Sequence, residues 1–123
     1  MRFGDNSLRV LLARYYARLA PERFKLERQV FVHYFPSTRT VIDEKGRINF
    51  LTTVGNGSDT RRVRIVLPFS YPHSQPKCWI TPKPEYHTYT DGSMCVHFRD
   101  GWGAERCAAQ VLVAACELLW GEK

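Results

Sequence analysis

The feature that most restricts the fold is a tight-turn sequence, Asn56-Gly57-Ser58-Asp59, between two strand-like segments. Residues 47–54 precede the turn, and residues 61–69 follow it with apolar residues at alternate positions. Asn and Gly accept the backbone angles of a two-residue hairpin loop, so the pattern predicts a β-hairpin.

Two further strands are predicted on either side of this hairpin. Residues 24–35 place Val30, Val32 and Tyr34 at alternate positions, and a Pro-Ser-Thr sequence interrupts the segment afterwards. Residues 77–81 place Cys78 and Ile80 on the face opposite Trp79. Because only short turns separate the four segments, an antiparallel meander is expected.

A helix is predicted on each side of the meander. Residues 8–19 carry apolar side chains at helical spacing after a capping residue, Asn6 or Ser7, and Pro21 lies at or just beyond the end. Residues 106–120 are apolar almost all round, which is typical of a buried helix, and Gly121 stops it. The expected fold is one α+β domain, residues 1–123, with a long coil over residues 82–105.

The composition excludes several classes of protein. Sixteen aromatic residues can bury enough surface to exclude disorder as the main state. No apolar run approaches the roughly 20 residues of a membrane span, and residues 1–6 lack the apolar core of a signal peptide. A soluble, cytoplasmic protein is therefore expected. Residues 1–64 hold 13 Lys or Arg against 6 Asp or Glu, which suits nucleic acid, an acidic protein partner or a solvated surface.

Of the four cysteines, only one is predicted to lie on irregular backbone. Cys78, Cys95, Cys107 and Cys116 form no Cys-x-x-Cys pair, so neither a metal site nor a disulfide framework is expected. Cys78 lies on a predicted strand, and Cys107 and Cys116 lie in the apolar helix, where a thiol is usually an inert packing group. Cys95 lies in the long coil between two histidines.

Three motifs surround Cys95 in the sequence. The first runs from Tyr71-Pro72 to Pro76, a rigid bend in which the aromatic-proline bond suits a cis peptide. The second is His87-Thr-Tyr-Thr-Asp-Gly-Ser-Met-Cys-Val-His97, and the third is Trp102, seven residues after Cys95.

In this order the motifs resemble the central part of a ubiquitin-conjugating enzyme. That family shows a Tyr-Pro-x-x-x-Pro bend, a strand, a His-containing loop, a Gly-x-x-Cys sequence with the nucleophile, a Trp, and a helix that ends in Leu-Leu. The matching residues are Tyr71-Pro72 to Pro76, His87, Gly92 to Cys95, Trp102 and Leu118-Leu119.

The chain departs from the family pattern at three points. His87 is followed by Thr88-Tyr89 where the family has Pro-Asn, the loop to Cys95 is two residues shorter, and the sequence stops at Lys123, before the two further helices of many eukaryotic members. The short form resembles the bacterial branch, whose genes lie in anti-phage cyclic-oligonucleotide (CBASS) operons or beside ubiquitin-like, activating-enzyme and deconjugating genes.

The resemblance implies a thioester transferase that needs no cofactor. Cys95 would accept the C-terminal glycine of a ubiquitin-like protein or of a nucleotidyltransferase tail from an activating enzyme, and would pass it to a lysine or another amine. His87 is the first candidate for an oxyanion donor or loop organiser in place of the missing Asn. Tyr89, His97 and the backbone N–H groups of residues 93–95 are alternatives.

Other residues have supporting roles in this interpretation. Asp91 either orients or deprotonates the incoming amine or holds the turn before Gly92. Gly92, Ser93 and Trp102 would support the loop. The basic residues of the first helix would meet the acidic docking domain of the activating enzyme; they are Arg9, Arg14 and Arg18. No membrane or nucleic-acid partner is expected.

Three alternatives remain at this point. A non-catalytic variant of the same fold would bind ubiquitin-like tails, but such variants lose the cysteine. A small basic RNA-binding domain would use the positive N-terminal half and exposed aromatics, although no RNP-type strand or Gly-x-x-Gly loop is present. A cysteine hydrolase would need His87 or His97 as the general base for Cys95.

Overall fold

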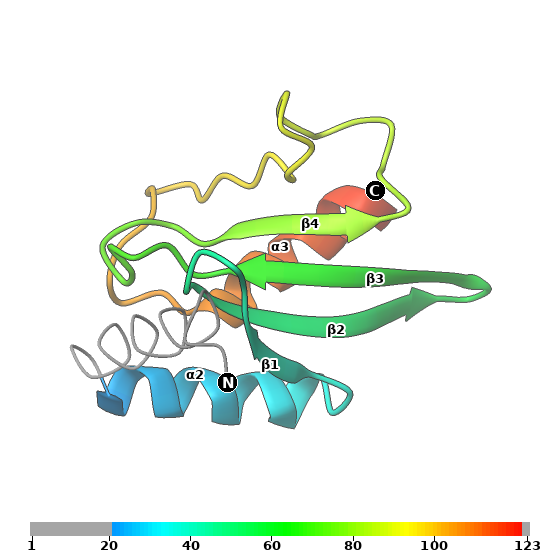
Figure 1. Cartoon of the computed structure of the whole chain (residues 1–123). Helices are drawn as coiled ribbons and strands as arrows, with labels where there is room; N and C mark the ends of the chain where they lie inside the picture. The colour runs from blue at the N-terminus through cyan, green and yellow to red at the C-terminus, as the bar shows by residue number, and fades with distance from the viewer. Residues whose placement is uncertain (1–20, 122–123) are drawn as a thin grey trace.

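A four-stranded antiparallel sheet with two helices forms the part of the chain that the computed structural model describes, residues 21–121 (Figure 1). Neighbouring strands in the sheet are also neighbours in the sequence, which confirms the predicted α+β class and antiparallel meander. In chain order the elements are α2 (Pro21–Tyr34), β1 (Arg39–Ile42), β2 (Ile48–Asn56), β3 (Asp59–Val66), β4 (Lys77–Thr81) and α3 (Ala108–Trp120).

The predicted strand over residues 24–35 is wrong, because this segment belongs to helix α2. Phe24, Phe31 and Phe35 recur at helical spacing and pack against the core. Glu27 lies on the same helix face and is only 1% exposed. An apolar residue at this position would have completed the helical spacing of apolar side chains. Pro21 begins this helix, where its missing N–H costs nothing. The first strand is instead β1, in a segment for which no strand was predicted.

The hairpin, the last strand and the last helix are confirmed. Asn56 pairs with Asp59 across the turn, and Gly57 takes a φ of 64° there. Strand β4 has the predicted bounds, and α3 begins two residues later than predicted and ends before Gly121. Cys107 therefore lies at the N-cap of α3 and not within the helix. The predicted helix over residues 8–19, with Arg9, Arg14 and Arg18, lies outside the described residues.

Both described helices pack on the same face of the sheet. Phe31 of α2 stacks on Phe50 of β2 with ring centroids 4.5 Å apart. Helix α3 crosses behind β3 and β4 in Figure 1 and buries Val111 and Leu112 in the same core as Ile65. Burial of these side chains is the main stabilising contribution of the fold. Within residues 21–121 no helix has the length and apolar composition needed to cross a membrane.

A buried polar cluster joins α2, the loop after β3 and the start of α3. The Glu27 carboxylate accepts hydrogen bonds from Arg23 Nε at 2.7 Å, from the Tyr71 hydroxyl, and from the Ala108 N–H at 2.8 Å. Arg23 also donates to the carbonyls of Ala104 and Arg106. Glu27 thus satisfies an N–H at the first turn of α3, a position that favours negative charge.

Candidate active site around Cys95

Cys95 follows a short hairpin-like loop within the predicted long coil. Thr88 and Met94 form an antiparallel bridge, and the Cys95 N–H donates to the His87 carbonyl at 2.6 Å. The Met94 N–H donates to the Cys78 carbonyl at 2.7 Å, which fastens the loop to β4. The loop therefore holds Cys95 beside the sheet on ordered backbone.

The His97 imidazole contacts the Cys95 thiol. The Sγ atom lies 3.2 Å from His97 Nε2, and the Tyr89 hydroxyl lies 3.3 Å from the same nitrogen. The pKa of the Tyr89 phenol is raised, first by hydrogen bonding to the Cys95 side chain and then by desolvation. The structure thus brings together three of the five predicted catalytic residues.

A pocket of about 440 Å³ opens beside the thiol. Cys95 and His97 line it together with His87, and the C-terminal half of α3 forms the opposite wall through Ala114, Glu117 and Leu118. Cys95 itself is half-buried. The thiol therefore lies at the edge of an open pocket.

His87 supports the loop through its backbone. Its φ of 67° lies in the left-handed region, which His adopts more often than most side chains, and its carbonyl accepts the Cys95 N–H. The imidazole is exposed, lines the Cys95 pocket and makes no hydrogen bond to another described residue. It is therefore available to donate to a substrate oxygen.

The backbone N–H groups near Cys95 are already engaged. Those of Met94 and Cys95 donate to the carbonyls of Cys78 and His87, as described above, and the Ser93 N–H donates to Asp91 Oδ1 at 2.8 Å. None of the three is free to hold an oxyanion. The hypothesis that these backbone N–H groups replace the missing Asn therefore loses its support.

Asp91 holds the turn that precedes Cys95. Its Oδ1 accepts the N–H and the hydroxyl of Ser93, at 2.8 and 2.6 Å, and its Oδ2 pairs with Lys77 Nζ at 2.7 Å. The pairing with Lys77 and the bonds from Ser93 keep the pKa of this carboxyl well below its usual range. Gly92 takes a φ of 90° in the same turn, and Ser93 is buried. This carboxylate is a weak base whose oxygens are occupied.

Trp102 fastens the coil to the predicted bend. Its indole N–H donates to the Pro72 carbonyl at 2.8 Å, and its ring packs between Tyr71 and Phe98, with centroid distances of 6.2 and 5.9 Å. The peptide bond between Tyr71 and Pro72 is cis, as predicted. Gln75, from the same bend, donates to the Val96 carbonyl at 3.0 Å.

The other three cysteines are placed for packing. Cys78 is 1% exposed, and burial raises the pKa of its thiol well above the ordinary value. Burial also raises the pKa of Cys116 to about 11. Cys107 is half-buried against the core at the N-cap of α3. All four thiols are free, and among residues 21–121 no group of three or more His, Cys, Asp or Glu gathers around a common point as metal ligands would.

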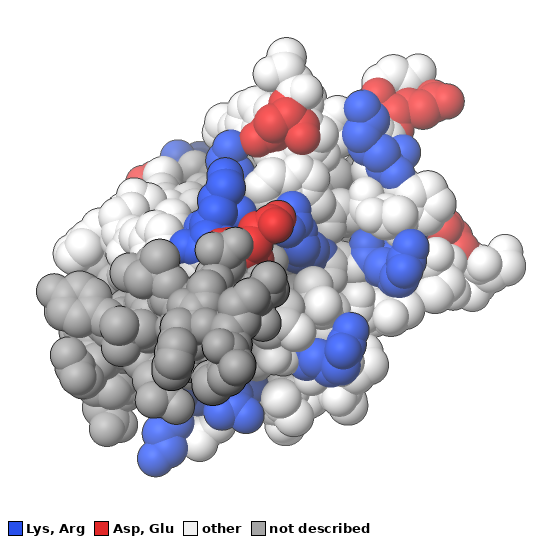
Figure 2. Space-filling model, in the orientation of Figure 1, with Lys and Arg blue, Asp and Glu red and all other residues white. Residues whose placement is uncertain are grey.

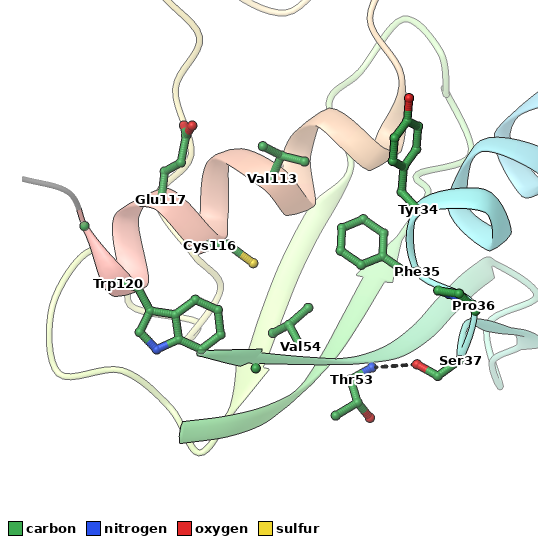
Figure 3. A pocket seen from close by; sticks show the side chains of 12 residues that line it. Tyr34, Phe35, Pro36, Ser37, Thr53, Val54, Val113, Cys116, Glu117 and Trp120 are labelled. Atoms are coloured by element: carbon green, nitrogen blue, oxygen red, sulfur yellow. Dashed lines mark hydrogen bonds between the residues drawn. The ribbon is translucent and has the colours of Figure 1, made fainter. Parts of the chain in front are cut away.

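A larger pocket, of about 650 Å³, lies away from Cys95 between the end of α2, β2 and the end of α3 (Figure 3). Phe35, Val54 and Trp120 point toward it, and Val113 lines its edge. None of the predicted site residues within 21–121 lines it, and its walls are mainly apolar. Of the residues that the structure describes, only Glu117 lines both pockets.

Two residues at the Cys95 site were not predicted from the sequence. Lys77 anchors Asp91, and Glu117 stands at the wall of the pocket. The sequence could have indicated Glu117, because it is the only charged residue of α3. Nothing in the sequence indicated the role of Lys77, since its partner Asp91 is 14 residues away across the loop.

No protein-family model matches the chain, and a search of the curated proteins finds no match either.

Proposed function

We propose that the chain is a ubiquitin-conjugating-enzyme-like acyl carrier in which Cys95 holds the acyl group as a thioester. The observation that carries the proposal is the position of the Cys95 thiol, 3.2 Å from His97 Nε2 at the edge of an open pocket. Together with the matching motif order, this favours Cys95 over the other three cysteines, which pack against the core.

The charging step exchanges one thioester for another. His97 accepts the Cys95 proton, and the thiolate attacks the carbonyl carbon of the glycine that the activating enzyme carries as a thioester. The new C–S bond forms as the bond to the activating enzyme's sulfur breaks, and that sulfur leaves as a thiolate. The donor is a ubiquitin-like protein or a nucleotidyltransferase tail, whose extended end would occupy the pocket between the loop and α3.

The transfer step passes the acyl group to an amine. The amine attacks the thioester carbonyl, and negative charge develops on its oxygen. As the amide forms, the C–S bond breaks and the Cys95 thiolate leaves and takes up the proton that the amine nitrogen loses. His87 is the favoured donor to that oxygen, because its imidazole is unpaired among the described residues whereas the neighbouring N–H groups are engaged. Asp91 is assigned to the turn and not to deprotonation of the amine.

A cysteine hydrolase is the nearest alternative, because a thiol and an imidazole are in contact. Such an enzyme orients its histidine through the second ring nitrogen. Among the described residues, His97 has hydrogen-bond partners only at Nε2, where Cys95 and Tyr89 both lie. Because no residue within 21–121 orients His97 through Nδ1, the carrier is favoured.

The test combines the protein with its activating enzyme, the donor protein and ATP, followed by a non-reducing gel. A thiol-sensitive adduct is expected with the wild type and with Cys116→Ala, and it is expected to disappear in Cys95→Ala. His87→Ala should still be charged but should discharge to an amine more slowly, by about 10²-fold if it is an oxyanion donor. An adduct that survives Cys95→Ala would refute the proposal.

A further inference from the structure

The face of the sheet turned away from α2 and α3 is strongly basic. Strand pairing places Arg39, Leu51, Arg64 and Trp79 in one row across β1, β2, β3 and β4. The next row brings Arg62 between Thr53 and Thr81. Figure 2 views the molecule from this side and shows Lys and Arg side chains spread over the strands.

These rows frame a shallow groove of about 520 Å³ with a mainly polar lining. Arg39, Arg62 and Arg64 all line it. The positions of the four strands that face this side also include Lys77, but they include no Asp or Glu. The basic groove, meaning Arg39, Arg62, Arg64 and Trp79, therefore has no internal acidic counterpart on its own strands.

The three arginines remain unpaired within the described part of the chain. Every ion pair found there involves other cations: Arg23, Arg47, Arg61 and Lys77. Arg39 and Arg62 are exposed, and Arg64 lies over the Trp79 ring at 4.7 Å from its centroid. Arg39 on β1 and the two arginines of β3 share one face of the sheet with β2 between them, and their like charges repel one another. An anionic partner would relieve this cost.

The arrangement favours carboxylates over nucleobases. A single-stranded nucleic acid needs exposed aromatic faces on which bases stack. Trp79 is the only aromatic residue at the outward positions of the four strands, and the Arg64 guanidinium covers its ring. The contact with Trp79 restrains the Arg64 guanidinium and uses none of its N–H donors, so they remain available to a carboxylate.

We propose that the basic groove is a docking site for an acidic segment of a partner protein, whose carboxylates pair with Arg39, Arg62 and Arg64. The groove lies on a different face from the helices and is separate from the Cys95 pocket. Docking there requires no acyl transfer, so failure of this proposal would leave the proposed activity of Cys95 untouched.

The test titrates the ¹⁵N-labelled full chain with an oligoglutamate peptide at low salt. Amide shifts are expected at Arg39, Leu51, Arg62 and Arg64, together with a shift of the Trp79 indole N–H. Binding should weaken steeply with added salt. No binding at low salt, or shifts confined to other parts of the chain, would overturn the proposal.

A matched pair of variants tests the role of charge position. Arg39→Glu with Arg62→Glu reverses two charges in the groove, and Lys25→Glu with Arg28→Glu makes the same change in net charge on α2, where both residues are exposed. The groove variant should lose about tenfold or more in affinity, whereas the α2 variant should change the affinity by about twofold or less.

Circular dichroism verifies that both variants remain folded. Arg39→Gln with Arg62→Gln replaces the groove variant if that variant does not fold. Equal losses in the two variants would refute the site, as would tighter binding of oligouridylate than of oligoglutamate at this face.

Discussion

Replacement of Glu27 tests whether one buried carboxylate joins the two helices to the bend beside the Cys95 loop. Glu27 is 1% exposed and accepts hydrogen bonds from Arg23, Tyr71 and Ala108. Glu27→Ala removes all three acceptor contacts at once. It leaves the N–H of Ala108 without a partner at the start of α3 and the Tyr71 hydroxyl without its acceptor.

The expected loss of stability follows from these contacts. Loss of a helix cap costs about 1 kcal/mol, and each buried polar group left unpaired costs roughly 1–3 kcal/mol. Arg23 is a quarter exposed and keeps the carbonyls of Ala104 and Arg106, so its own cost is small. Glu27→Ala should therefore lower the free energy of unfolding by about 3 kcal/mol, which lowers Tm by roughly 10–15 °C.

Urea unfolding followed by circular dichroism and tryptophan fluorescence measures this loss. Glu27→Gln keeps one acceptor oxygen for Ala108 but loses the charge, so it should lower the free energy of unfolding by about 1–2 kcal/mol. This variant replaces Glu27→Ala in the test if the Ala variant does not fold. Glu44→Ala is the control, because Glu44 is exposed in the turn between β1 and β2; it should change stability by about 0.5 kcal/mol or less. The reasoning is refuted if Glu27→Ala unfolds within about 1 kcal/mol of the wild type.

Three further predictions concern the thiols and the loop. Alkylation of Cys116 should be slow at pH 8 and should accelerate about tenfold per pH unit up to its pKa of about 11, because only the thiolate reacts. Mass spectrometry of labelled peptides measures the rate, and fast labelling at pH 8 would contradict the prediction. Gly92→Ala should cost about 1 kcal/mol or more because of the φ of 90°, whereas Gly55→Ala should be tolerated in unfolding assays, since its Cβ would meet only ordinary contacts of 3.7 Å or more. The pKa of Asp91 is lowered on folding, so its stabilisation of the loop is present above the unfolded pKa of about 4 and is lost as the pH falls through the folded value. The amide shift of Ser93 should therefore begin to move only well below pH 4, and an Asp91→Asn variant should lack this transition.

The sequence predicted those elements whose signals are local. The turn residues at 56–59 specified the hairpin, and short alternating or uniformly apolar segments located β4 and α3. Residues 24–35 were predicted as a strand, although most of them belong to helix α2, because Glu27 interrupts the apolar stripe of this helix. Only partners that are distant in sequence, Tyr71 and Ala108, make that position suitable for a carboxylate.

By itself, the sequence predicted that Cys95 would lie in an irregular loop between two histidines. The tertiary structure decided which histidine contacts the thiol, because the loop turns the His97 imidazole to Cys95 and directs the His87 carbonyl to the Cys95 N–H. It also decided that Asp91 pairs with Lys77 and that the nearby N–H groups are engaged. Spacing along a chain specifies which groups are available, whereas hydrogen-bond partners depend on which segments the folded backbone brings together.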